Sequence, residues 1–240
     1  MDKFHILAIG AHPDDIELSA SGTVLRHISL GYNVAICDLT RGELGTRGNA
    51  DLRLKEAEAA ALVLGVKARE NLGMKDGFFD FGRENILSVV KVIRKYRPEI
   101  VLANAVSDRH PDHGRASKLI SDACFYSGLV KVETVNDEGL IQEAWRPKAV
   151  YHYIQDRNIK ADLVVDISAF MDKKIESIMA FRSQFFDPES KEPETPISTK
   201  SFIEYIRAKN RAYARDIGVE YAEAFTVERN IGVNNLFDLL

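Results

Sequence analysis

The chain has 240 residues, of which 45% are hydrophobic and 28% are charged, a balance typical of folded globular proteins and not of disordered or collagen-like chains. Its formal net charge of −4 excludes the broad positive field of a nucleic-acid or anionic-membrane binder. No stretch approaches the roughly 20 apolar residues of a membrane span, and the first apolar run is too short for a secretion signal, so we expect one domain over residues 1–240, located in the cytoplasm, without nucleic-acid or membrane partners.

The first half of the chain alternates short apolar runs with longer segments of helical spacing. In chain order we predict a strand at Phe4–Ile9, a helix at Ser21–Leu30, a strand at Val34–Leu39, a glycine-rich loop at Thr40–Asn49, helices at Asp51–Leu64 and Glu84–Tyr96, a strand at Ile100–Ala103 and a helix at Gly114–Tyr126. This repeated alternation of strand and helix is typical of the α/β class, with a mainly parallel sheet covered by helices on both faces.

The second half adds strands at Ala149–Ile154 and Leu163–Asp166 and helices at Met171–Phe181 and Ser201–Ile217. Between these two helices, residues 187–196 (DPESKEPETP) are polar, hold three of the seven prolines and show no periodicity. We predict a surface loop there, and the sequence leaves its role open.

Two short segments combine His, Pro and Asp directly after predicted strands: AHPDD at 11–15 and DRHPDH at 108–113. In an open α/β sheet, the loops that leave the carboxyl ends of the strands converge where the strand order reverses, and ligands bind there. Proline fixes its own φ and restricts the residue before it, which stiffens both loops. We therefore expect the two segments to meet at one site.

The spacing within these segments favours a metal site. His12 and Asp15 are three residues apart, as are His110 and His113, so each pair can share one side of a turn. A catalytic zinc uses three protein ligands, which His12, Asp15 and His113 could provide, leaving Asp14 and His110 for general base and general acid. Either segment alone would equally fit a helix start, since Asp caps helices and Pro occupies early positions, so the prediction depends on their pairing.

At these residues the chain resembles a known family. AHPDDIELSASGT followed by RHPDHG is similar to the PIG-L/LmbE-like zinc-dependent N-acetylglucosamine deacetylases, and LTRGELGTRG with RLKEA resembles their bacillithiol-biosynthesis branch. The resemblance implies a Rossmann-like sheet, a Zn²⁺ ion on His12, Asp15 and His113, a general base at Asp14, a group at His110 that protonates or stabilises the reacting amide, and a homo-oligomer. Fe²⁺ accepts the same ligands.

Arginines give the remaining indication of a substrate. The branch substrate, N-acetylglucosaminyl malate, carries two carboxylates, and arginine binds carboxylates in bidentate fashion. The resemblance favours Arg53 and Arg109 for this role over Arg41 and Arg47. For Arg53, a structural role in a salt bridge with Glu56 is an obvious alternative to substrate binding.

Three other functions compete. A dinucleotide-binding oxidoreductase is disfavoured because His12 or Pro13 takes the place of the glycine that must approach the pyrophosphate. A non-catalytic metal-binding or sugar-binding protein would have no need for Asp14 or His110. A deacetylase for another N-acetylglucosamine-containing substrate, such as a chitooligosaccharide, would use identical zinc chemistry and remains the main alternative.

Overall fold

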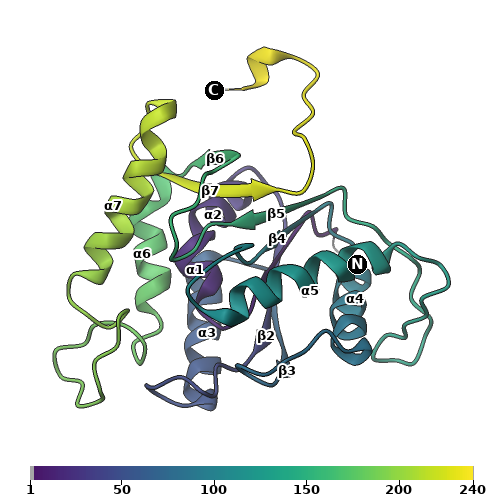
Figure 1. The fold of residues 1–240 in the computed structure, drawn as a ribbon, viewed down its shortest axis with the longest axis horizontal. Coiled ribbons are helices and arrows are strands. Elements are labelled where there is room, and N and C mark those ends of the chain that lie inside the picture. Colours follow the sequence, from purple (N-terminus) through teal and green to yellow (C-terminus); the bar gives the residue numbers. More distant parts are fainter. Residues whose placement is uncertain (1–2, 240) are drawn as a thin grey trace.

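A single seven-stranded sheet forms the centre of the computed structural model, which describes residues 3–239 (Figure 1). Its strands lie in the order β3-β2-β1-β4-β5-β7-β6. Their bounds are Ile6–Gly10 for β1, Val34–Thr40 for β2, Ala68–Met74 for β3, Ile100–Ala103 for β4, Ala149–Tyr153 for β5, Leu163–Asp166 for β6 and Ala222–Val227 for β7. Among the strands of residues 3–239, β7 alone runs opposite to the other six, so the predicted mainly parallel sheet is confirmed.

Helices cover both faces of this sheet, as predicted (Figure 1). One face carries α4 (Arg83–Tyr96) and α5 (Pro111–Ser127). The other carries α1 (Asp15–Ser19), α2 (Ser21–Ser29), α3 (Ala50–Leu64) and α6 (Met171–Met179), with α7 (Phe202–Ala214) beside them. The residues of β1 alternate between the two hydrophobic clusters, as expected for a buried strand. Within residues 3–239, no helix is long and apolar enough to cross a membrane.

The sequence analysis did not predict two of the strands, β3 and β7. The edge strand β3 reads ARENLGM and lacks an apolar run, yet the side chain of Arg69 within it is only 7% exposed, and Glu17 and Asp38 pair with its guanidinium at 2.6 and 2.8 Å. The strand β7 reads AEAFTV, and its Glu223 is likewise buried against Lys174 at 2.7 Å. Ion pairs thus replace part of the apolar pattern on which strand prediction relies.

A helix begins within each of the two motifs, which the sequence analysis did not predict. The helix expected at Gly114 starts at Pro111, where the fixed φ of proline suits the first helical position, and His110 caps it by accepting a hydrogen bond from the Asp112 backbone. The short helix α1, which was not predicted, starts at Asp15. Both motifs therefore lie where a strand passes into a helix.

Candidate active site

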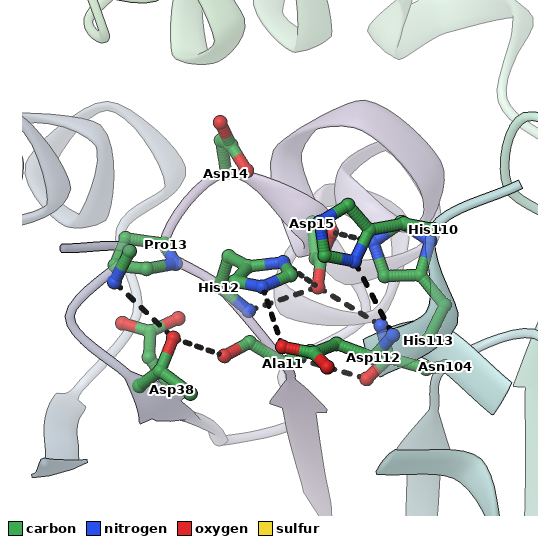
Figure 2. A network of polar contacts seen from close by, with 12 residues as sticks. Ala11, His12, Pro13, Asp14, Asp15, Asp38, Asn104, His110, Asp112 and His113 are labelled. Atoms are coloured by element: carbon green, nitrogen blue, oxygen red, sulfur yellow. Dashed lines mark hydrogen bonds and ion pairs between the residues drawn. The ribbon is translucent and has the colours of Figure 1, made fainter. Parts of the chain in front are cut away.

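The two motif segments meet at the reversal of the strand order. β1 pairs with β2 on one side and with β4 on the other, and the motifs follow β1 and β4. The imidazoles of His12, His110 and His113 gather there, with ring centroids 4.7 Å apart for His12 and His110, 5.2 Å for His110 and His113 and 5.6 Å for His12 and His113 (Figure 2). The structure thus brings together two segments that are far apart in sequence.

The Asp15 carboxylate lies in the middle of this group. Its Oδ2 accepts hydrogen bonds from the His12 backbone at 3.0 Å and from the Asn104 side chain at 2.9 Å. Its Oδ1 accepts one from Gln155 Nε2 at 3.0 Å and lies 3.1 Å from His113 Nε2. Burial alone would raise the pKa of Asp15, but the nearby imidazoles of His113 and His12 hold it well below its usual range. Asn104 and Gln155 were not predicted as site residues.

His113 is oriented by a second carboxylate. Its Nδ1 makes a short contact with Asp108 Oδ2, and Asp108 is fixed in turn by the Arg157 backbone N–H at 2.7 Å. Burial opposes the charged imidazole, yet Asp15 and Asp108 together raise the pKa of His113 to about 9. The Nε2 of His113 is therefore directed towards Asp15 and the cleft.

His12 also contacts two carboxylates, both through Nε2. Its Nε2 lies 3.0 Å from Asp76 Oδ1 and 3.3 Å from Asp112 Oδ2. Burial would lower the pKa of His12, but the hydrogen bonds with Asp112 and Asp76 raise it to about 10. Asp112 belongs to the second motif, whereas Asp76 lies in a Lys-Asp-Gly turn that sequence reasoning had not connected with the site.

Asp14 has an unusual backbone conformation. Its φ of 114° is rare for a residue other than glycine, and such strain is found at functional sites. Its carboxylate accepts a hydrogen bond from Arg53 Nη2 at 2.8 Å. Burial nevertheless dominates and raises the pKa of Asp14 to about 7, against the lowering effect of Arg53. Figure 2 shows Asp14 set apart from the contacts that join the imidazoles.

His110 lies half-buried at the N-terminus of α5. Burial, followed by the charges of His12 and His113, lowers its pKa from the ordinary value. Its Nδ1 accepts a hydrogen bond from the Asp112 backbone at 3.3 Å. This hydrogen bond therefore holds the side chain at the cleft and does not involve Nε2.

All five predicted metal and catalytic residues line one cleft of about 290 Å³. The wall opposite the motifs comes from the C-terminal part of the chain and is largely apolar or aromatic. It comprises Thr195, Pro196, Ile197, Phe202, Tyr205, Ile206 and Lys209. The Pro-rich loop 187–196, whose role the sequence left open, thus ends at the mouth of the cleft.

The two predicted substrate arginines occupy different environments. Arg53 is buried, and its guanidinium donates to Asp14 and to the backbone oxygens of Pro13 at 2.6 Å and Gly42 at 3.3 Å. Arg109 is 54% exposed at the cleft and pairs with Asp156 at 2.7 Å. Arg53 therefore has protein partners, whereas Arg109 faces solvent at the mouth.

The donor atoms suit a divalent ion. Residues 3–239 contain two sets of three side chains with possible ligand atoms within 4.8 Å of one another. One set is His12, His110 and His113, and the other is His12, Asp76 and Asp112. The set predicted from the sequence contains Asp15 in place of His110. The Asp15 carboxylate oxygens lie 3.1 Å from His113 Nε2 and 3.7 Å from His12 Nδ1. Imidazole nitrogens with a carboxylate oxygen are ligands that Zn²⁺ and Fe²⁺ accept.

Comparisons with known proteins show which proteins the chain resembles. Residues 7–124 match the family model described as PIG-L: GlcNAc-PI de-N-acetylase. A diacetylchitobiose deacetylase of Thermococcus kodakarensis is 33% identical over 77% of this chain and 71% of its own length. A probable N-acetyl-alpha-D-glucosaminyl L-malate deacetylase 2 of Bacillus anthracis is 26% identical over 75% and 81%. The crystal structure of the conserved protein TT1542 from Thermus thermophilus matches with a TM-score of 0.84 and 33% identity, covering 96% of this chain and 97% of that one.

Proposed function

Because the chain belongs to the PIG-L (GlcNAc-PI de-N-acetylase) family, we propose that it is a metal-dependent hydrolase that removes the N-acetyl group from an N-acetylglucosamine conjugate. The observation that carries this proposal is the position of Asp14 and His110. Both line the cleft together with His12, Asp15 and His113. A protein that only bound a metal or a sugar would have no need for either of these two groups.

His12, Asp15 and His113 are proposed to hold the ion, with zinc as the expected metal and ferrous iron as an alternative. An ion bound there would act as a Lewis acid that polarises the amide carbonyl. The hydrogen bonds from Asn104 and Gln155 to Asp15 fix the carboxylate, and Asp108 fixes the ring of His113. Such outer partners orient the ligands and tune the site.

The proposed chemistry divides proton transfer between two groups. Asp14 accepts a proton from the water that attacks the acetyl carbonyl carbon. When the C–N bond breaks, His110 in its protonated form gives its proton to the departing nitrogen, and acetic acid and a free amine result. The proton taken up by Asp14 then returns to His110 through solvent, which restores both groups. Arg53 holds the Asp14 carboxylate through a 2.8 Å hydrogen bond, and this contact orients the base.

For the substrate we propose N-acetylglucosaminyl malate, as in bacillithiol biosynthesis. Two observations support this substrate: Arg109 stands exposed at the cleft mouth, where a carboxylate could reach it, and the Bacillus anthracis relative is named for this conjugate. A chitooligosaccharide is the alternative, supported by the name of the Thermococcus kodakarensis relative. Assembly into a homo-oligomer remains a prediction of the family resemblance.

Acetate release tests the proposal. Protein loaded with Zn²⁺ is assayed with N-acetylglucosaminyl malate, diacetylchitobiose and free N-acetylglucosamine, and the assay is repeated after chelation. We expect metal-dependent acetate release that is fastest with the malate conjugate. Faster turnover of diacetylchitobiose would instead select the alternative substrate. Activity that survives removal of the metal, or no acetate from any of the three, would contradict the proposed chemistry.

A further inference from the structure

Two lysines of the C-terminal half, Lys174 and Lys209, make closely similar backbone contacts but differ in one partner. An ammonium group carries a positive charge and three N–H donors. Lys174 Nζ donates to the backbone oxygens of Glu17 at 3.0 Å and Leu18 at 2.9 Å, and it pairs with the carboxylate of Glu223 at 2.7 Å. The protein itself therefore satisfies the three donors and the charge of Lys174.

Lys209, on α7, has only the first two kinds of contact. Its Nζ donates to the backbone oxygens of Ile154, at 3.0 Å, and of Gln155. Within residues 3–239 it forms no ion pair, and its third donor has no acceptor. In contrast to Lys174, which is fully buried, Lys209 lines the cleft. A carboxylate in the cleft would complete for Lys209 the set of partners that Glu223 completes for Lys174.

The surroundings of Lys209 disfavour a charge that has no counter-ion. Burial, followed by the charge of Lys174, lowers the pKa of Lys209 to about 8. The three carboxylates whose charges oppose this lowering, Asp108, Asp156 and Glu223, are paired instead with His113, Arg109 and Lys174, respectively. An anion that enters the cleft would therefore gain a charge-assisted hydrogen bond from Lys209 without displacing a protein carboxylate.

The other basic side chains of the cleft already have carboxylate partners. Among the described residues that line it, the lysines and arginines are Arg53, Arg109 and Lys209. Arg53 donates to Asp14 at 2.8 Å, and Arg109 pairs with Asp156 at 2.7 Å. A substrate carboxylate must compete with Asp156 for Arg109, whereas it meets no such competitor at Lys209.

We propose that Lys209 is a specificity-determining residue whose ammonium group binds a carboxylate of the substrate. This inference rests on the proposed function and narrows its substrate class to N-acetylglucosamine conjugates in which the attached group carries a carboxylate. A malate unit has two carboxylates, so Lys209 and Arg109 can each bind one. The two cations contact consecutive residues, Gln155 and Asp156, and so lie along the same part of the cleft.

Acetate release by the Zn²⁺-loaded protein tests this role with two matched substrates, N-acetylglucosaminyl malate and its dimethyl ester. The ester keeps the sugar and the amide but has no negative charge. Lys209→Met removes the charge and nearly keeps the length of the side chain. We expect it to lower kcat/KM for the malate conjugate by about 10–100-fold, as for the loss of one charge-assisted bond, mainly through KM, and to leave kcat/KM for the ester unchanged.

Two further variants separate this role from a structural one. Lys209→Gln keeps an N–H donor for the backbone oxygens of Ile154 and Gln155 but has no charge, and we expect the same selective loss. Arg207→Met is the matched control, because Arg207 lies on the same helix, pairs with Asp172 at 2.8 Å and does not line the cleft. It should leave the preference for the malate conjugate over the ester unchanged.

Equal losses on both substrates would mean that Lys209 acts on a step common to both, through the backbone that it holds or through the acetate product, and would overturn the inference. No loss on either substrate, or an equal loss of preference in Arg207→Met, would overturn it too. So would a wild-type protein that hydrolyses the ester as well as the malate conjugate, although the hydrolase would stand. Circular dichroism verifies folding, and misfolding of both Lys209 variants would make Lys209 a residue of general stability and contradict the inference. No acetate from either substrate with the wild-type protein would contradict the proposed function itself.

Discussion

The two walls of the cleft are built in different ways. On the motif wall, Asp15 alone accepts three hydrogen bonds, from residues that follow β1, β4 and β5. The opposite wall combines α7 with the irregular segment 187–201, whose ties to the glycine-rich loop are few: Arg47 donates to Ser190 at 2.7 Å, and Glu192 accepts from the Gly48 backbone at 2.9 Å. The family match at residues 7–124 includes the first wall except Gln155, and it includes no residue of the second wall. From this difference we propose that the chemistry resides in the motif wall, which also carries Arg109, and that the second wall shapes the substrate space.

The largest effect should come from the centre of the motif wall. Asp15→Ala removes a proposed ligand and leaves the side-chain amides of Asn104 and Gln155 without this acceptor. We expect metal affinity to fall by more than the about 10–100-fold typical of outer partners, with loss of acetate release. Metal content after gel filtration measures this, with Asp156→Ala as the control. A fully metallated Asp15→Ala protein would contradict the assignment of this ligand.

Asp14→Asn should separate chemistry from metal binding. The carboxamide keeps the shape of the side chain but cannot take a proton, and general acid–base groups contribute on the order of 10²–10⁴-fold. We expect kcat to fall by that factor while the metal content stays normal. His110→Ala should behave in the same way. Near-normal kcat in either metallated variant would exclude that residue from proton transfer.

The two arginines should respond differently to truncation. Arg53 holds Asp14, so Arg53→Ala should slow the malate conjugate and neutral N-acetylglucosamine alike. Arg109 is exposed, so Arg109→Ala should slow only the malate conjugate, by about 10–100-fold, equivalent to a lost charge-assisted bond of about 1.5–3 kcal/mol. The ratio of kcat/KM values for the two substrates measures this.

Equal losses on both substrates with Arg109→Ala would contradict a carboxylate-binding role, and no loss would make this arginine a surface residue. A selective loss with Arg53→Ala would restore it as a substrate ligand. Lys replacement refines the result, because it keeps the charge but loses the planar fork. Full activity in Arg109→Lys would show that charge alone is sufficient.

The smallest effect should come from the contacts of loop 187–196. Glu192 is 44% exposed and pairs with Arg47 Nε at 3.7 Å. Exposed ion pairs contribute about 0.2–1 kcal/mol, so Glu192→Ala should raise KM by less than about fivefold and leave kcat unchanged. A large fall in kcat would mean that this loop takes part in the chemistry, and the proposed division between the two walls would be wrong.

Sequence alone predicted most of the fold and the convergence of the two motifs. Apolar runs identified β1, β2 and β4, since these strands are buried on both faces. The pattern failed for β3 and β7, where Arg69 and Glu223 interrupt it and find their ion-pair partners only in the folded chain.

The residues that support the metal site were harder to predict. Asp76 lies in an Asp-Gly turn, a composition that indicates only a change of chain direction. Asn104 and Gln155 carried a usable signal, because each directly follows a predicted strand, at the edge where the motif residues were expected. Their role nonetheless depends on β1, β4 and β5 being placed near one another, which no local pattern specifies.

The most direct test of the account is the position of the ion. Crystals grown with Zn²⁺ and measured at the zinc absorption edge would locate it by anomalous scattering. We predict one peak roughly 2.0–2.2 Å from a nitrogen of His12, a nitrogen of His113 and an oxygen of Asp15, with an open side towards Asp14. A peak between His12, Asp76 and Asp112, or no peak at the cleft, would contradict the account.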